Sequence, residues 1–511
     1  MKTEIKKKEQ AMMCAEDLKI NNTNIKLNNV KNKKLNSKET RKTSGITLIA
    51  LVVTIVVLLI LAGITISLVF SENGIIAKAK EAAEKTNQAA INEQEQMNGL
   101  GTTIENMLNG TGGSGEETTP PEPTLPSDGS YSEEKGVNTP NLEEGMTAIK
   151  WDEAKNDWIE TTGSDQEWYD YTAKKWANAM TEDGSMWVWI PRYAYQIADN
   201  YHTNSVTGGT IEIKFLKDSS NVAYDGTSTW DNVSGQGKWN VHPAFNYGQE
   251  VSGLWVAKFE ASSKEGNSNN SGDNVTTKTL QVKPGVSSWR NIEIGNMYTV
   301  CKNYNSILNS HMMKNDEWGA VAYLSKSKYG KENEELWINN SSSFITGSAG
   351  NNAIANTDVG TTTDYTSTQG VKASTTGTVY GVYDMSGGAH EYVAAYVDNG
   401  NSNLTKYGSS LVNGESKTKN MYSKGSTDNR ENNYSTNSGK YGDAVYETSA
   451  NGNSNNSSWY NDYSPFPYTS DPFFGRGGDY SIGMITGAFC FGSSSGEKVG
   501  HYSFRPVLVA I

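Results

Sequence analysis

The sequence predicts a mixed α+β head with many irregular loops, preceded by a single transmembrane α-helix. Three observations predict this. Residues 46–70 form one long apolar run without a charged side chain. From about residue 147, short apolar and aromatic runs alternate with polar turns. The 511 residues include 50 Gly, 27 Tyr and 13 Trp but only 12 Pro, which is typical of loops around an aromatic core. A chain of this length is expected to form more than one unit.

Composition also excludes several classes of protein. A net charge of −13 and a pI near 5.1 argue against a nucleic-acid partner. A hydrophobic fraction of 36% and a mean hydropathy of −0.61 exclude a polytopic membrane protein. Three Cys are too few for a disulfide-dense scaffold, and five scattered His leave little material for a histidine metal cluster.

The first element is a basic leader, residues 1–45, followed by the apolar run. Residues 1–44 carry 12 Lys and Arg against five acidic residues, so this part is +7 and the remainder −20. The run is long enough to cross a bilayer, and positive flanks stay in the cytoplasm. We therefore expect a single-pass bacterial membrane protein with a cytoplasmic N-terminus and an extracellular C-terminal domain. A cleaved signal peptide and a buried core helix are the alternatives.

Residues 44–50, SGITLIA, resemble the type IV prepilin cleavage and methylation signal. The resemblance implies cleavage by a prepilin peptidase between Gly45 and Ile46, methylation of Ile46, and other pilin-like subunits as partners. Ala50 departs from the family, which usually has Glu there to pair with a neighbouring subunit's N-terminus. Filament assembly with Ala50 therefore stays open, and a plain signal anchor is the alternative.

The next elements connect the membrane segment to the head. Residues 71–108 are rich in Ala, Glu, Gln and Lys, which favours an exposed helical stalk, so residues 46–108 form the transmembrane helix and stalk. Residues 109–146 are rich in Gly, Ser, Thr, Pro and Glu, and we expect a flexible spacer. The extracellular domain then spans residues 147–511.

Within this domain, strands are expected where apolar and aromatic residues cluster between turns. A helix is expected at 317–324, EWGAVAYL, capped by Asn315. Long polar stretches at 262–279, 340–376 and 399–465 are expected to be loops or insertions, some of them mobile. The predicted strands are 186–197, 210–216, 254–261, 379–385 and 504–511.

Three landmarks in order resemble the formylglycine-generating enzyme and sulfatase-modifying-factor superfamily. Residues 382–393, VYDMSGGAHEYV, look like its YDMxGNVWEW motif, and Asn315 to Trp318 lie where its PTEAEWE helix would fall. Arg476-Gly477-Gly478, followed by residues 503–506, SFRP, resembles its closing signature. The resemblance covers roughly residues 180–511 and implies a C-type-lectin-like fold. The framework residues it implies are Asp384, Gly387, Glu391, Arg476, Gly477, Gly478 and Arg505.

These framework residues have a physical interpretation. Gly387 and Gly388 permit a tight turn with positive φ. Glu391 and Arg505 could form a buried ion pair that fixes the loops. The alternative, in which both are surface charges with separate partners, is left open.

The resemblance also bears on chemistry. Formylglycine-generating enzymes bind copper and substrate thiol through paired cysteines just after the RGG sequence, but residues 479–487 contain no Cys. Cys490 alone cannot supply a two-sulfur copper site, and its pairing with Cys301 stays open. We therefore expect no catalytic residues and no metal cofactor. The oxygen-rich residues 398–401 leave calcium as a minor alternative.

Binding is the remaining expectation. Residues 479–502 mix Tyr, Ser and charged residues with small ones, as adaptable recognition surfaces do. Non-catalytic members of this fold, including variable receptor-binding proteins of diversity-generating retroelements, carry ligand contacts here. We therefore expect an adhesin or receptor for an extracellular protein or glycan; a minor pilin or pseudopilin and a formylglycine-type oxidase are alternatives. The expected ligand-binding residues are Asp479, Tyr480, Ser481, Ile482, Met484, Thr486, Ser494, Glu497, Lys498, His501 and Tyr502.

Overall fold

A computed structural model describes residues 129–265, 274–353 and 360–510. The chain divides into two compact units, Met1–Thr118 and Thr119–Ile511, and every described residue belongs to the second unit. The predicted leader, membrane helix and stalk, with Gly45, Ile46 and Ala50, lie outside the described residues. Among the residues that the structure describes, no helix is both long and apolar enough to span a bilayer.

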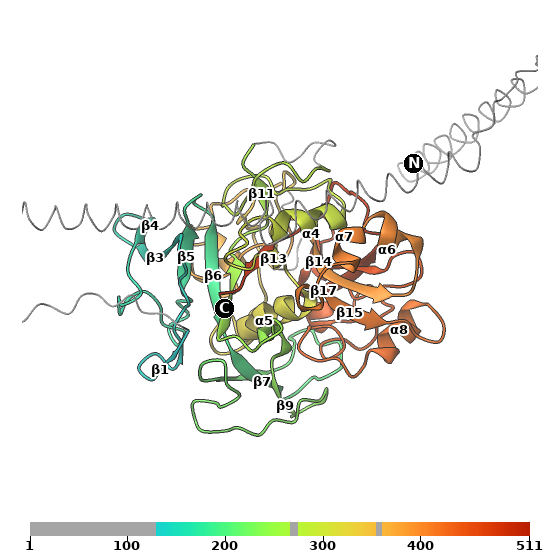
Figure 1. Ribbon diagram of the computed structural model, residues 1–511, viewed down its shortest axis with the longest axis horizontal. Coiled ribbons are helices and arrows are strands. Elements are labelled where there is room, and N and C mark those ends of the chain that lie inside the picture. Colours follow the sequence, from blue (N-terminus) through green and yellow to red (C-terminus); the bar gives the residue numbers. More distant parts are fainter. Residues whose placement is uncertain (1–128, 266–273, 354–359, 511) are drawn as a thin grey trace, which may run out of the picture. The chain divides into compact units, whose positions relative to one another are not determined.

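The head is a mixed α+β structure in which strands predominate, as predicted (Figure 1). Its largest sheet has the order β13-β19-β10-β6-β5-β3-β4, with antiparallel pairing between all neighbours. In chain order its strands are β3 (Met146–Asp152), β4 (Asp157–Glu160), β5 (Asn178–Thr181), β6 (Met186–Pro191), β10 (Gly253–Ala257), β13 (His311–Met312) and β19 (Pro506–Leu508).

A second sheet has the order β15-β14-β16-β17, and β18 pairs with β14 outside this path. Strand β14 is parallel to β15 and β18 and antiparallel to β16. In Figure 1 this sheet and the first lie on opposite sides of the head, with α5 between them in this view. Its strands are β14 (His390–Asp398), β15 (Asn420–Ser423), β16 (Phe473–Gly477), β17 (Gly487–Ser494) and β18 (Tyr502–Ser503).

Smaller elements complete the head. A three-stranded sheet has β7 (Tyr193–Ile197) between β8 (Ile211–Phe215) and β9 (Trp239–Val241), and two pairs join β1 (Tyr131–Ser132) to β2 (Val137–Asn138) and β11 (Ser262–Ser263) to β12 (Leu280–Gln281). The α-helices are α4 (Ile294–Lys302), α5 (Asn315–Lys326), α6 (Ser402–Lys406), α7 (Ser409–Val412) and α8 (Arg430–Thr436). Short 3₁₀ turns lie at Pro243–Phe245, Gly370–Ala373, Ser416–Thr418, Trp459–Asn461 and Gly483–Ile485.

The core is aromatic, as the composition predicts. Trp189 and Trp255 face each other across β6 and β10, with ring centres 5.2 Å apart. Gly253 is needed beside them, because a Cβ there would lie 2.3 Å from the Trp189 ring. The fully buried tryptophans include Trp168, Trp176, Trp187, Trp189, Trp255, Trp289, Trp318 and Trp459.

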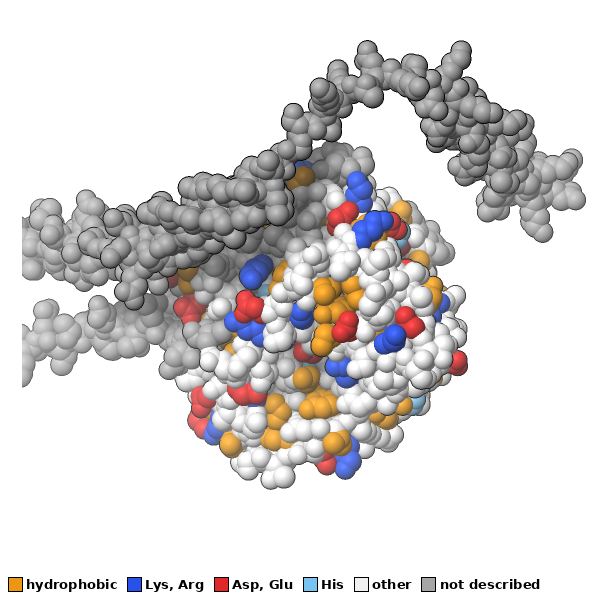
Figure 2. Space-filling view, turned by 45° about the vertical axis from the view of Figure 1, so that its right-hand side comes forward, with side chains coloured by type: hydrophobic (Ala, Val, Ile, Leu, Met, Phe, Trp, Pro, Cys, Tyr) orange, Lys and Arg blue, Asp and Glu red, His pale blue; other side chains and the backbone are white. Residues whose placement is uncertain are grey.

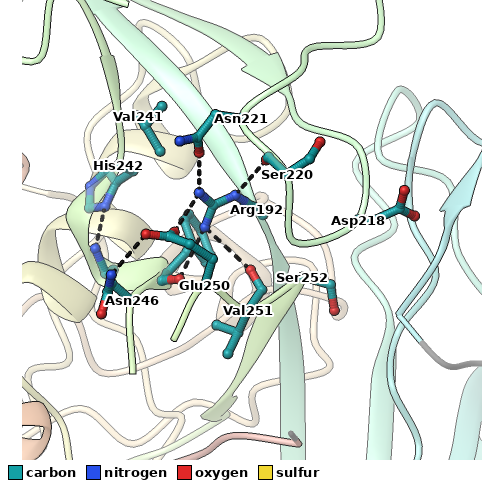
Figure 3. Close-up of polar contacts among 12 residues, drawn as sticks. Arg192, Asp218, Ser220, Asn221, Val241, His242, Asn246, Glu250, Val251 and Ser252 are labelled. Carbon is teal, nitrogen blue, oxygen red and sulfur yellow. Dashed lines mark hydrogen bonds and ion pairs between the residues drawn. The ribbon is translucent and has the colours of Figure 1, made fainter. Parts of the chain in front are cut away.

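The predicted strand 186–197 is two strands in different sheets. The break falls at Arg192, after Pro191, which lacks the N–H that continues a ladder. Arg192 is fully buried, and Figure 3 shows its guanidinium bound by the loops on either side of it. It forms an ion pair of 2.5 Å with Glu250 and donates to the Ser220 carbonyl at 3.0 Å. At the break between β6 and β7, the Arg192 side chain therefore joins the neighbouring loops by hydrogen bonds and an ion pair.

The predicted strand 379–385 is wrong: these residues are buried irregular backbone. Side chains satisfy part of that backbone instead of a ladder. Lys258 Nζ donates to the carbonyls of Val379 and Gly381, at 2.6 and 3.0 Å, and Arg505 donates to the Tyr383 carbonyl at 3.0 Å. The apolar pattern reports burial here and not strand pairing.

The predicted helix is present and longer than expected. It begins at Asn315, so Lys314 and not Asn315 is the residue before its first turn. The Glu317 carboxylate accepts a hydrogen bond of 2.8 Å from the Lys314 backbone N–H, which fixes the start of the helix.

Two polar stretches are more ordered than expected. Residues 399–465 contain three short helices and β15, and bury Tyr434 and Trp459. Residues 131–145, assigned to the spacer by their composition, fold onto the head: Val137 and Asn138 are fully buried, and the Asn138 amide donates to the carbonyls of Asp218 and Ser252. Side-chain to backbone hydrogen bonds order these segments where apolar residues are few.

Candidate functional site

The predicted binding segment, residues 479–502, returns twice to the start of β14. The Tyr480 N–H donates to the Gly388 carbonyl at 3.1 Å, and the His390 N–H donates to the His501 carbonyl at 2.9 Å. Between these two points the chain forms β17, which pairs with β16. Tyr480 and His501, near the two ends of the segment, are therefore brought together around His390. We call this region the His390 surface.

The eleven predicted residues differ in exposure. Asp479, Thr486 and Tyr502 are buried, so they support the surface from below. Thr486 donates to the Asp479 carbonyl at 3.1 Å and closes the turn between them. Half-buried residues are Tyr480, Ile482 and Ser494, and exposed ones are Ser481, Met484, Glu497, Lys498 and His501.

An aromatic stack forms the base of the His390 surface. The His390 ring stacks on Tyr502 with centres 4.9 Å apart, and Tyr502 packs against Tyr392 at 4.3 Å. The Tyr392 hydroxyl lies 2.6 Å from the Ser494 hydroxyl and donates to the Glu497 carbonyl at 3.2 Å. The stack therefore links Ser494 and Glu497 to the residues around His390.

Asp479 holds the turn that carries Tyr480. Its Oδ1 accepts hydrogen bonds from the Ser481 N–H at 2.7 Å and the Ser481 hydroxyl at 2.5 Å, and its Oδ2 lies 3.6 Å from His390 Nε2. Burial lowers the pKa of His390 to about 4, although Asp479 opposes this shift. His390 is therefore neutral at pH 7.

Phe344 and Arg290 extend the surface beyond the predicted residues. The Tyr480 ring meets Phe344 edge-on at 5.0 Å, and the Arg290 guanidinium lies 3.7 Å from the centre of the Phe344 ring. Arg290 also donates to the Gly500 carbonyl, so it ties Phe344 to the loop before His501. Nothing in the local sequence around either residue indicates this role.

The buried ion pair between Glu391 and Arg505 is present, and both side chains are fully buried. Arg505 Nε donates to Glu391 Oε2 at 2.7 Å, and its two other nitrogens donate to the carbonyls of Ala257 and Tyr383. Burial alone would lower the pKa of Arg505, but the adjacent Glu391 carboxylate outweighs it and the net shift is upward. This arginine therefore stays charged and joins β10, β14 and β19.

The other framework residues also connect distant segments. Asp384 accepts from the Asn339 amide at 2.9 Å and the Gly347 N–H at 2.8 Å. Arg476 donates to Asn315 Oδ1 at 3.3 Å and to the Ala444 carbonyl at 3.2 Å. The four glycines Gly387, Gly388, Gly477 and Gly478 all have positive φ, as a pair of tight turns requires.

Cys301 and Cys490 are both buried free thiols, so the disulfide left open by the sequence is not formed. Burial raises the pKa of each thiol well above its usual value, which keeps both protonated. Within the described ranges, no three His, Cys, Asp or Glu side chains gather as metal ligands.

A cavity elsewhere on the head was not predicted. It has a volume of about 580 Å³ and lies between the β5–β6 turn and the end of α4.

On the face seen in Figure 2, acidic and basic side chains are interspersed over a mostly uncharged surface, with a patch of hydrophobic side chains among them.

No protein-family model and no curated protein matches this chain.

Proposed function

We propose that this chain is a membrane-anchored, surface-displayed binding protein, an adhesin or receptor, whose non-catalytic head recognises an extracellular protein or glycan. The observation that supports this most directly is the His390 surface. It presents Tyr480, Ser481 and His501 to solvent from a rigid base of stacked aromatic rings and a buried ion pair. Recognition residues held in place before binding lose less entropy when the ligand arrives.

We further propose that the head has a C-type-lectin-like, sulfatase-modifying-factor-like fold. Support comes from contacts between the landmarks that carry the resemblance. Arg505 pairs with Glu391, and Arg476 bonds to Asn315 at the start of α5. Motifs that lie far apart in the sequence therefore touch one another, as parts of one framework should.

The proposed display on the cell surface rests on the sequence of residues 1–108. A prepilin-like subunit that caps a short filament is the second candidate, favoured by residues 44–50. Mass spectrometry of the mature chain separates the two: a methylated Ile46 at the N-terminus supports processing as a pilin, and an intact Met1 in the membrane fraction supports a plain anchor.

Binding is tested by applying the full-length chain, purified in detergent, to arrays of glycans and of surface proteins. Replacing Tyr480 and His501 by Ala should reduce binding of at least one ligand found by about tenfold or more, since central aromatic contacts dominate such surfaces. Tyr224→Ala is the matched control, because Tyr224 is half exposed and remote in sequence from this segment. A wild-type chain without any ligand, or equal binding of every ligand by both variants, contradicts the proposal.

A further inference from the structure

We propose that the cavity between the β5–β6 turn and the end of α4 is a binding site for a short uncharged oligosaccharide, separate from the His390 surface. Its volume of about 580 Å³ lies within the range of small-molecule sites. Four segments converge on it: residues 144–145 before β3, the turn 181–183 between β5 and β6, residues 276–280 leading into β12, and residues 300–307 at the end of α4. None of its lining residues belongs to residues 479–502.

The floor of the cavity is ordered by a hydrogen-bond network. The Tyr304 hydroxyl donates to Asp183 Oδ1 at 3.1 Å and lies 2.8 Å from the Thr181 hydroxyl. The Trp187 indole donates to the same Thr181 oxygen at 3.1 Å, and its ring lies 5.4 Å from the Tyr304 ring. The Tyr304 ring is therefore held in one position before a ligand arrives, which limits the entropy lost on binding.

The remaining lining groups match the chemistry of sugar hydroxyls. Asn303 offers an amide, which both donates and accepts, and Thr276 offers a hydroxyl. Asn305 offers its amide N–H groups, since its Oδ1 already accepts from the Ile307 and Leu308 N–H groups, and Thr279 offers its oxygen as an acceptor, since its hydroxyl donates to Glu265 at 2.6 Å. Ile307, with 70% of its surface exposed, adds an apolar contact for the C–H face of a sugar ring. This mixture of amides, hydroxyls and one apolar side chain suits a polyhydroxylated ligand.

Charge narrows the class of saccharide. Among the described lining residues, the carboxylates Glu144, Glu182 and Asp183 stand against one cationic side chain, Lys278. Asp183 already accepts hydrogen bonds from Thr181, Ser185 and Tyr304, so Glu144 and Glu182 are the carboxylates that face a ligand. Sialylated and sulfated sugars would be repelled, whereas uncharged hydroxyls donate well to carboxylates. A basic peptide also suits the carboxylates, but it would leave most of the hydroxyl and amide groups without a matching partner, so we assign the site to an uncharged saccharide.

The test is isothermal titration of the full-length chain in detergent with maltotetraose, cellotetraose, chitotetraose and mannotetraose. At least one should bind, and the double variant Glu182→Gln with Asn303→Ala should bind it about tenfold or more weakly, because each lost bond removes a polar contact to the sugar. Both side chains are exposed, so folding should be unaffected. Near-ultraviolet circular dichroism checks this.

Three further arms make the outcome decisive. Glu431→Gln, an exposed carboxylate on α8, should bind like the wild type. The variant Tyr480→Ala with His501→Ala should also keep saccharide binding, which separates this site from the His390 surface. Binding of tetralysine or sialyllactose but of none of the four sugars overturns the assignment. So does sugar binding that the double variant leaves unchanged, or no binding by the wild type.

Discussion

Arg505 makes its contacts entirely inside the core, where each charged atom must find a partner. Glu391 neutralises it, and the carbonyls of Ala257 and Tyr383 accept its remaining hydrogens. A pair of this kind fixes geometry more than it adds stability, because taking both charges out of water costs about as much as their attraction returns.

Removing one partner should therefore be worse than removing both. Arg505→Met is expected to lower the free energy of unfolding by about 3–5 kcal/mol, since it leaves Glu391 charged and buried. Adding Glu391→Leu should recover part of this loss. Urea unfolding followed by tryptophan fluorescence measures both. Lys155→Met, at an exposed pair with Asp152, is the control and should change little; equal losses in the single and double variants contradict the interpretation.

Glu335 and Asp462 are acidic residues whose charges interact. Burial, and then the Asp462 charge, raise the pKa of Glu335 from 4.5 to about 9, and burial raises that of Asp462 to about 8. Glu335 Oε1, Asp462 Oδ1 and the Tyr460 hydroxyl each lack a hydrogen-bond partner among the described residues. The folded state therefore binds protons here more tightly than the unfolded chain does.

Because the pKa of Glu335 is raised in the folded state, the protein should be less stable at alkaline pH. The stabilising contribution of protonated Glu335 is complete below pH 4.5, its ordinary value, and is lost as the pH rises towards 9. Glu335→Gln should remove that dependence, so that the variant gains at least about 1 kcal/mol over the wild type between pH 5 and pH 8.5. Thermal unfolding across this range measures it. Glu431→Gln should follow the wild-type profile, and a Glu335→Gln profile parallel to the wild type would sink the idea.

At the scale of elements, the turn before β14 depends on glycine. Gly387 has φ of +77°, and a Cβ there would lie 2.5 Å from Ile338 Cγ2 and 2.6 Å from the Asn339 carbonyl oxygen. Gly136 has φ of +68° but open space around it, which makes it a matched control.

Gly136→Ala should cost about 1–2 kcal/mol from backbone strain alone, and Gly387→Ala clearly more, because it adds a clash with backbone. Chemical denaturation of the two variants side by side tests this. If the two variants lose the same free energy of unfolding, the close packing around Gly387 does not contribute to stability.

Local pattern predicted some elements and missed others for identifiable reasons. The α5 helix was predictable because Trp318, Val321 and Ala322 follow the helical period. Its cap was not: Asn315, the predicted cap, lies inside the helix, and Glu317 binds the Lys314 N–H instead. Residues 379–385 look like a strand because they are buried and apolar, yet Lys258 and Arg505 satisfy their carbonyls. The helix α4 was missed because its sequence, IGNMYTVCK, contains β-branched residues and a glycine that disfavour helix.

The sequence was informative about the candidate site only where the motif was continuous. The framework residues could be predicted because Gly387, Gly388 and Glu391 lie in one stretch and Arg505 follows the closing signature. Phe344 and Arg290 could not, since they reach Tyr480 and Gly500 from distant loops. The 580 Å³ cavity could not be predicted either, because four separate segments enclose it.

At the scale of the whole molecule, the compact unit begins before the predicted spacer ends. This unit is Thr119–Ile511, and Asn138 is fixed within it by three hydrogen bonds. The Asn138 amide donates to the Asp218 and Ser252 carbonyls, and its Oδ1 accepts from the Asp218 N–H at 2.8 Å. Residues 131–145 are therefore part of the head.

A fragment of residues 147–511 should accordingly be less stable than one of residues 119–511. The loss should be at least about 2 kcal/mol, because the three hydrogen bonds of Asn138 and the burial of Val137 disappear together. Differential scanning calorimetry of the two fragments measures it. Identical melting curves would show that residues 131–145 do not stabilise the head and belong to the spacer.

Strand β19 lies between β13 and β10 inside the largest sheet, although the ribosome makes residues 506–508 after every other strand of that sheet. The sheet cannot close while the chain is still being synthesised up to that point. Until then the polypeptide stays open and aromatic-rich, and a stop codon only a few residues upstream of Pro506 would leave β13 without its neighbour and β10 with an unpaired edge.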